Sequence, residues 1–262
     1  MTDEEKIRLG GMALPNGVLV HGPHAWACAI RHDDGRIEVT SSSKRLQASR
    51  VQSPFLRGPL RLAEAIALLP QVKRKLPAAK LPMENPRVLA SMLGAAVVVR
   101  GIRGSSLRPA AQELLAGLTS LAPAVLSLHG SDVAGYHGAE HISIGTYEYG
   151  AGATKEHERC GGHLVGPLIA TSAAANLLAG LAPERMRRQA RAAAQVGAIA
   201  AAMEIFGWMT RNPSHPLAQA LSKPGHELQH RLSTVEPSPE QLEVAEAALA
   251  ACLELERAAG CA

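Results

Sequence analysis

Two long and nearly uncharged stretches constrain the fold of this chain most strongly. Leu164 to Leu181 contains no charged residue across 18 positions, and Ala192 to Thr210 contains only Glu204. A helix that crosses a bilayer needs about 20 predominantly apolar residues, so the first stretch lies at the lower limit of that length. Its Ala, Ser, Thr and Gly content lowers its hydrophobicity, and a buried helix of a soluble protein explains it equally well. We therefore expect long helices here and leave membrane contact open.

The composition indicates that the helices pack through small side chains. Hydrophobic residues make up 47% of the chain, but aromatic residues make up only 3%. Large rings usually supply much of the area that a core buries. A core without them has to be built from closely packed helices with small residues between them, an arrangement found in soluble bundles and in lipid.

The N-terminal region has a different pattern, which predicts short strands. Gly10-Gly11 and Asn16-Gly17 are turn signals, and Trp26 to Ile30 is an apolar run. Residues 32–36 are expected to form a hairpin turn, followed by the alternating segment 37–40. We expect a small β-rich segment at this end of the chain.

The rest of the chain is expected to be helical. Helices are expected over residues 60–69 (ending at Pro70), 88–99, 108–128 (interrupted near Pro123), 164–181, 192–210 and 240–257. The segment after Pro213, with His215, His226 and His230, is expected to be a loop. The sequence thus predicts a mainly α protein (α+β), with a β-rich segment over residues 1–58 and a helical metal-site domain over 59–262, together forming one structural unit.

The stretch His137-Gly138-Ala139-Glu140-His141 matches the H-x-x-E-H pattern of zinc sites. In a helix the two histidines lie four residues apart on one face, and Glu140 points to nearly the same side. Two imidazoles at that spacing can share a metal, and the carboxylate can deprotonate a water bound to it. The alternative is a pair of hydrogen-bonded or solvated histidines with an exposed carboxylate. We take His137 and His141 as metal ligands and Glu140 as the catalytic base.

A catalytic zinc needs a third protein ligand and an open position. Candidates for that ligand, or for a supporting position, are Glu148, Cys160 and Glu204. Glu204 stands alone in an apolar run, so it requires a partner: the metal, a histidine or Arg211. Cys160 with His157 can complete a zinc site, and the alternatives are a Cys/His nucleophile pair and a plain buried thiol, of which we favour the buried thiol. The sequence leaves the third ligand open.

Two specific segments, Tyr136-His137-Gly138-Ala139-Glu140-His141 and Arg159-Cys160-Gly161, occur among shorter matching segments that cover most of the chain. The shorter segments lie at residues 10–11, 16–18, 22–23, 54–58, 147–148, 157–158, 197–204, 224–229, 233–237 and 243–245. In this order they resemble the YqhQ-like proteins, an uncharacterised bacterial family often described as predicted metal-dependent enzymes, many with membrane segments. The resemblance implies a metal site, and the family's positions His137, Glu140, His141, Glu148, Cys160 and Glu204 are all retained.

Together, the residues and the resemblance predict a metal-dependent hydrolase that uses zinc on an unidentified substrate. One alternative is a non-enzymatic, membrane-associated scaffold or assembly protein whose His, Glu and Cys side chains form a structural cluster. A third reading is a tetrapyrrole-like cofactor bound by the histidines. A structural zinc site has four protein ligands, so the number of ligands separates the first two readings.

The net charge and the cysteine pattern limit which partners and which cellular location we expect. The formal net charge is +4, but the basic residues are not interleaved with aromatic ones, so nucleic-acid binding is not expected. The four cysteines form no C-x-x-C pair, and residues 1–8 are charged with no apolar run after them. We therefore expect no disulfides and a cytoplasmic location, or the cytoplasmic face of a membrane, rather than secretion. Homo-oligomerisation is left open.

Overall fold

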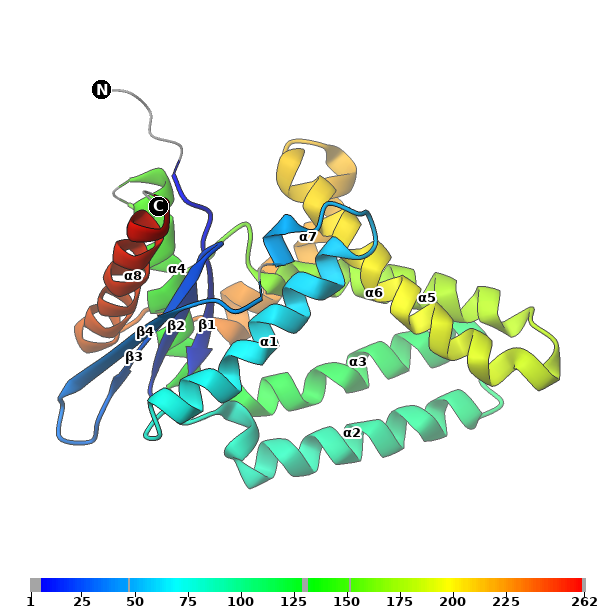
Figure 1. Cartoon of the computed structure of the whole chain (residues 1–262). Helices are drawn as coiled ribbons and strands as arrows, with labels where there is room; N and C mark the ends of the chain where they lie inside the picture. The colour runs from blue at the N-terminus through cyan, green and yellow to red at the C-terminus, as the bar shows by residue number, and fades with distance from the viewer. Residues whose placement is uncertain (1–5, 47, 129–131, 151, 261–262) are drawn as a thin grey trace.

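Four short strands near the N-terminus form an antiparallel sheet whose spatial order follows the sequence (Figure 1). They are β1 (Gly10–Leu14), β2 (Gly17–His21), β3 (Ala25–Arg31) and β4 (Ile37–Ser43). The computed structural model describes residues 6–46, 48–128, 132–150 and 152–260. The turn between β1 and β2 is two residues long, and the β3–β4 hairpin has its turn at the expected residues 32–36. The predicted β-rich segment is confirmed.

Eight α-helices in the described residues make up most of the remaining chain, and 67% of the protein is helical. They are α1 (Arg57–Lys75), α2 (Pro86–Gly104), α3 (Pro109–Leu128), α4 (Val133–Tyr149), α5 (Val165–Gly180), α6 (Arg187–Arg211), α7 (Pro216–Leu228) and α8 (Pro239–Gly260). The predicted fold class, mainly α with a small N-terminal sheet, is confirmed.

Prolines interrupt the helices less than the sequence suggested. Helix α1 continues through Pro70 to Lys75, and α3 passes through Pro123. An internal proline costs a helix about 3 kcal/mol because a hydrogen bond is lost. In α1 this cost is offset by burial on both sides of the proline, where Leu68 and Val72 lie in the core. The expected loop after residue 213 was also wrong, because α7 and a π-helical turn occupy much of it.

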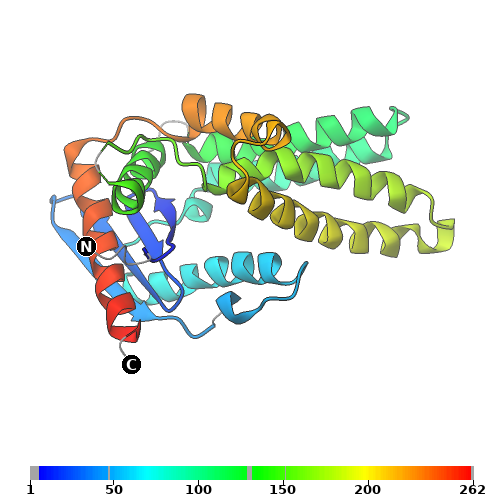
Figure 2. The same ribbon diagram turned by 90° about the horizontal axis from the view of Figure 1, so that it is seen from above.

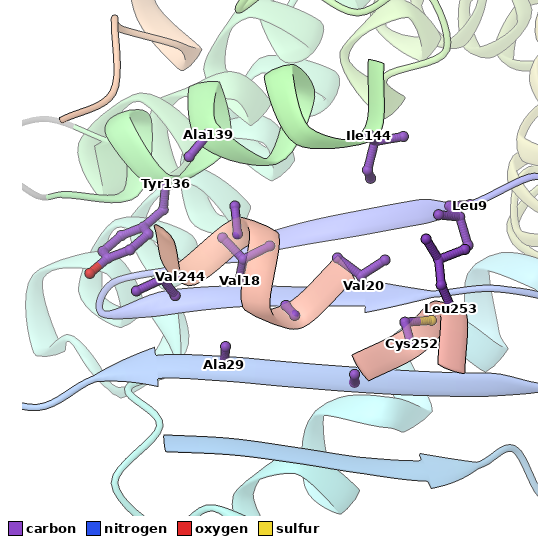
Figure 3. Close-up of a cluster of buried hydrophobic side chains, with 13 residues drawn as sticks. Leu9, Val18, Val20, Ala29, Tyr136, Ala139, Ile144, Val244, Cys252 and Leu253 are labelled. Carbon is purple, nitrogen blue, oxygen red and sulfur yellow. The ribbon is translucent and has the colours of Figure 1, made fainter. Parts of the chain in front are cut away.

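The sheet is covered on both faces. On one face, α4 and α8 pack against Val18, Val20 and Ala29, as Figure 3 shows. On the other face, α1 packs against strand residues that include the fully buried Trp26. Alternation of side chains along each strand assigns neighbouring residues to opposite faces. The sheet therefore holds α4, the helix with the H-x-x-E-H motif, in a fixed position.

Helices α2, α3, α5 and α6 form an arm that extends away from the sheet (Figures 1 and 2). Within it, α2 packs against α3 and α5 against α6. Among the described residues, three segments are long and apolar enough to cross a membrane: Ala111–Leu128, Gly161–Gly180 and Glu184–Arg211. No more than 22% of the apolar window in any of these segments is buried inside the protein. This exposure is compatible with membrane association.

Candidate metal centre

Helix α4 carries the motif, and its glycines allow it to pack closely against the chain around it. A Cβ at Gly138 would collide with the backbone carbonyl of Val235, and one at Gly135 would collide with the Gln241 side chain. Because these positions are glycines, α4 lies directly against the segment between α7 and α8 and against the start of α8. That contact brings the backbone carbonyl of Ser233 within reach of His137.

Both motif histidines are held by backbone carbonyls. The Nδ1 of His137 lies 2.8 Å from the Ser233 oxygen, and the Nδ1 of His141 lies 2.6 Å from the Lys155 oxygen. A carbonyl can only accept, so each Nδ1 carries the proton and each Nε2 keeps its lone pair. Burial lowers the pKa of both rings, and for His141 burial together with the nearby His137 lowers the pKa to about 3. Both imidazoles are therefore neutral, as metal ligands must be.

Cys160 completes a group of three converging donor atoms. Its Sγ lies 3.5 Å from the Nε2 of His137, and one donor atom from each of His137, His141 and Cys160 lies within 4.8 Å of the others. Two ligands of a tetrahedral zinc lie about 3.5 Å apart, so the donors that are farther apart would have to approach by about 1 Å, through side-chain rotation, to bind one ion. Burial raises the pKa of the Cys160 thiol to about 12, so only a bound cation would keep it as thiolate.

One atom of this group is buried without any partner in the described structure. The Nε2 of His141 has no hydrogen-bond partner, although almost none of its surface is exposed. A buried polar atom left unsatisfied costs about 1–3 kcal/mol, so such atoms call for an explanation. A metal ion bound at this lone pair would supply the missing interaction, and the donor set therefore fits a metal.

Glu140 lies beside this group on the wall of a cavity of about 460 Å³ that all three ligand candidates also line. Its side chain is buried, and burial raises its pKa to about 8. On the other side, its carboxylate lies against Gly11 of β1, where a Cβ would collide with it. The glycine at this position is what leaves room for the carboxylate between α4 and the sheet.

A second cavity, of about 680 Å³, adjoins the group at His141. His141 and His157 line both cavities, and the second is also lined by Phe206 and Met209 of α6 and by residues of α7. Of the three candidate ligands, His141 thus borders both the cavity beside the sheet and the one beside α6 and α7.

Glu148 supports the loop that carries Cys160 and does not join the three donor atoms. Its carboxylate accepts from the guanidinium of Arg159 and lies 3.2 Å from the Nε2 of His157. The backbone N–H of His157 in turn donates to the side chain of Gln229 at 3.0 Å. These contacts fix the segment from residue 157 to 160 against α4 and so position the thiol.

The carboxylate of Glu204 has a partner that the sequence did not indicate. The Nε of Arg57 in α1 donates to its carboxylate at 2.7 Å, and a second guanidinium nitrogen does the same. Among the described residues, the group that could hold a metal contains His137, His141 and Cys160, and neither Glu148 nor Glu204. The structure thus brings four of the six predicted site residues, these three and Glu140, to one cavity.

Several residues that build the site were not selected from the sequence. Gln229 and Ser233 lie in the π-helical turn that follows α7, and both fall in segments that carried the family resemblance. Gly11 also falls in such a segment, so the family resemblance could have pointed to all three of these residues. Lys155 contributes through its backbone carbonyl, and a backbone atom leaves no signature in residue type.

One comparison with known proteins gave a match. A family model described as "Protein of unknown function (DUF1385)" matches residues 129–255, just under half of the chain. This span contains the H-x-x-E-H motif, Cys160 and the π-helical turn, whereas the sheet and α1 to α3 lie outside it. Neither curated proteins nor solved structures gave a match.

Proposed function

We propose that the protein is a zinc-dependent hydrolase, with His137, His141 and Cys160 as the metal ligands and Glu140 as the general base. The observation that carries this proposal is the orientation of the two imidazoles. Backbone carbonyls hold both Nδ1 protons, which directs both Nε2 lone pairs to the ion position near the Cys160 thiol. Such carbonyl partners are the usual support of metal-binding histidines.

The type and number of donors favour a catalytic zinc. Two imidazoles and a thiolate suit zinc, whereas magnesium prefers oxygen ligands. Three protein ligands leave one position of a tetrahedral ion open, which is typical of catalytic sites, while structural sites use four. A scaffold built around a structural zinc would need a fourth ligand, and among the described residues the candidate group has three.

The chain's own residues would perform the proton transfers. When bound, the zinc would act as a Lewis acid that activates water and polarises the substrate carbonyl. Glu140 would take the proton from the attacking water and deliver it to the leaving group. Burial raises the pKa of Glu140 to about 8, and a cation bound beside it would lower that pKa, so that the carboxylate needed to accept the proton would be present near neutral pH.

The proposed enzyme would work at a membrane. The exposed apolar surface of the helical arm supports this, as do the three segments long enough to cross a bilayer. The resemblance to the YqhQ-like proteins, many of which have membrane segments, agrees with this location. We place the sheet and the site on the cytoplasmic side, in line with the expectation from the cysteine pattern.

Removal of the metal is expected to abolish hydrolysis reversibly. We would purify the protein in detergent, load it with zinc and follow cleavage of p-nitrophenyl acetate and of a fluorogenic peptide mixture. Treatment with 1,10-phenanthroline should remove activity, and added zinc should restore it. Activity that survives complete metal removal would contradict the proposal, as would a zinc-loaded protein that cleaves neither class of substrate.

A further inference from the structure

Strand β1 has one free edge. The strand order places β1 at an end of the sheet, where it pairs only with β2. Among the described residues, no backbone–backbone hydrogen bond joins residues 10–14 to any element other than β2. Proteins usually cover or disrupt such an edge, because its unpaired N–H and C=O groups recruit other extended chains.

The register shows which backbone groups point to that free edge. The bonds from Gly22 N to Ala25 O and from Arg31 N to Asn16 O fix which pairs of β2 and β3 are hydrogen bonded. Bonding alternates along an antiparallel ladder, so Gly17, Leu19 and His21 turn their bonding groups towards β1. Their partners on β1 are Leu14, Met12 and Gly10. The N–H and C=O groups of Gly11 and Ala13 therefore face away from the sheet.

The free edge borders the cavity that holds the candidate metal centre. Five consecutive residues, 9–13, line this cavity together with the three ligand candidates and Glu140. Hydrogen bonds join the residues just before β1 to α4. The N–H of Ile7 donates to the Tyr147 hydroxyl at 3.0 Å, and the Lys6 ammonium donates to the Glu148 carbonyl at 3.0 Å. Residues of the strand and of the motif helix thus line one cavity.

We propose that the substrate is an extended peptide that adds to the sheet along the free edge of β1. This inference rests on the proposed hydrolase function and names its substrate class. Hydrogen bonds to the outward groups of Gly11 and Ala13 would hold the peptide backbone, as in other cases of strand addition. The residues of α4 that line the same cavity would then face a backbone carbonyl of the bound peptide.

The reaction on such a substrate is the hydrolysis of an amide bond. Water adds its oxygen to the carbonyl carbon, and the C–N bond breaks with its electron pair leaving on nitrogen. Glu140 takes a proton from the water and passes it to that nitrogen, so the immediate products are a carboxylic acid and an amine. The acid then gives its proton to the amine, which leaves a carboxylate and an ammonium group. No further reactant is needed. A small ester would not engage the strand, because it lacks the repeated N–H and C=O groups that an edge recognises.

The test removes one outward N–H group without disturbing the ladder. Ala13→Pro does so on β1, and proline is tolerated at edge strands. Val39→Pro is the matched control, because Val39 lies on the opposite edge strand, β4, and its N–H also points outward by the same alternation. Both variants are made in zinc-loaded Glu140→Gln protein in detergent and titrated with fluorescein-labelled β-casein, an unstructured polypeptide, by fluorescence anisotropy.

We expect Ala13→Pro to raise the Kd for casein about tenfold, because the loss of one hydrogen bond together with some steric conflict costs about that much binding free energy. The control Val39→Pro should change the Kd less than twofold. Equal Kd values in Ala13→Pro and its parent would overturn the inference, as would equal weakening by both prolines. If Ala13→Pro does not fold, the comparison is made with the Glu140→Gln protein and a ten-residue peptide, with and without alternating N-methyl groups. Equal binding of those two peptides would also overturn the inference.

The outcomes separate this inference from the function on which it rests. Casein binding that depends on Ala13, in a protein that hydrolyses nothing, would support the peptide site and contradict the hydrolase. Zinc-dependent ester hydrolysis with casein binding that is insensitive to Ala13 would support the hydrolase and overturn the peptide site.

Discussion

Replacement of Glu140 by Gln is expected to reduce zinc-dependent turnover by about 10²–10⁴-fold, the usual contribution of a general base. Gln is close to Glu in size, so it fits the space that Gly11 leaves beside the carboxylate. It cannot accept a proton, however. The three proposed ligands are untouched, so bound zinc should stay at the wild-type level. The measurement is kcat for the best substrate, together with the zinc content of the same sample.

The control for this variant is Glu254→Gln, which makes the same chemical change on an exposed position of α8. It should leave both turnover and zinc content unchanged. Wild-type turnover in Glu140→Gln would remove the carboxylate from the mechanism. Loss of zinc in that variant would instead show that Glu140 is a ligand and not a base.

Replacement of Lys44 by Met is expected to destabilise the protein by about 3–5 kcal/mol, a large part of the 5–15 kcal/mol that folded domains have. Lys44 and Glu64 form an ion pair at 3.1 Å with side chains that are only 3% and 8% exposed. The ammonium also lies 3.1 Å from the Nδ1 of His21, which lines the cavity at the candidate site. Without Lys44, the Glu64 carboxylate would be buried with no cation beside it. Denaturant unfolding in detergent measures the loss.

The second substitution Glu64→Gln should recover much of that stability. It removes the unpaired charge, and its amide oxygen can still accept from the N–H of Ala48, which bonds Glu64 at 3.1 Å. A Lys44→Met protein as stable as the wild type would contradict this account of the buried pair. So would a double variant less stable than the single one, because buried charges are costly only when they are unpaired.

The fold class and the motif helix could be predicted because they depend on local patterns. Spacing of four residues placed His137 and His141 on one helical face, and the long uncharged runs became α5 and α6. The end of α1 could not be predicted from Pro70, because tertiary packing of Leu68 and Val72 outweighs the local cost of the proline.

The site was predictable to the extent that residue type reveals it. Cys160 could be named as a candidate, but its place beside His137 depends on Glu148 and Gln229, which hold the connecting loop. The partner of Glu204 could not be found from the sequence, because Arg57 lies 147 positions away. Likewise, nothing in the chain's pattern shows that the edge of β1 borders the motif helix, since that follows from how the sheet packs.

Metal content tests the central claim most directly. We would measure it by plasma mass spectrometry on detergent-purified wild type, on the double variant His137→Ala and His141→Ala, and on a control double variant, His226→Ala and His230→Ala. The control histidines are also four residues apart and have stacked rings, but neither belongs to the candidate group. We expect about one zinc per chain in the wild type and the control, and none in the motif variant. Folded wild type without zinc, or a motif variant that keeps it, would contradict the account.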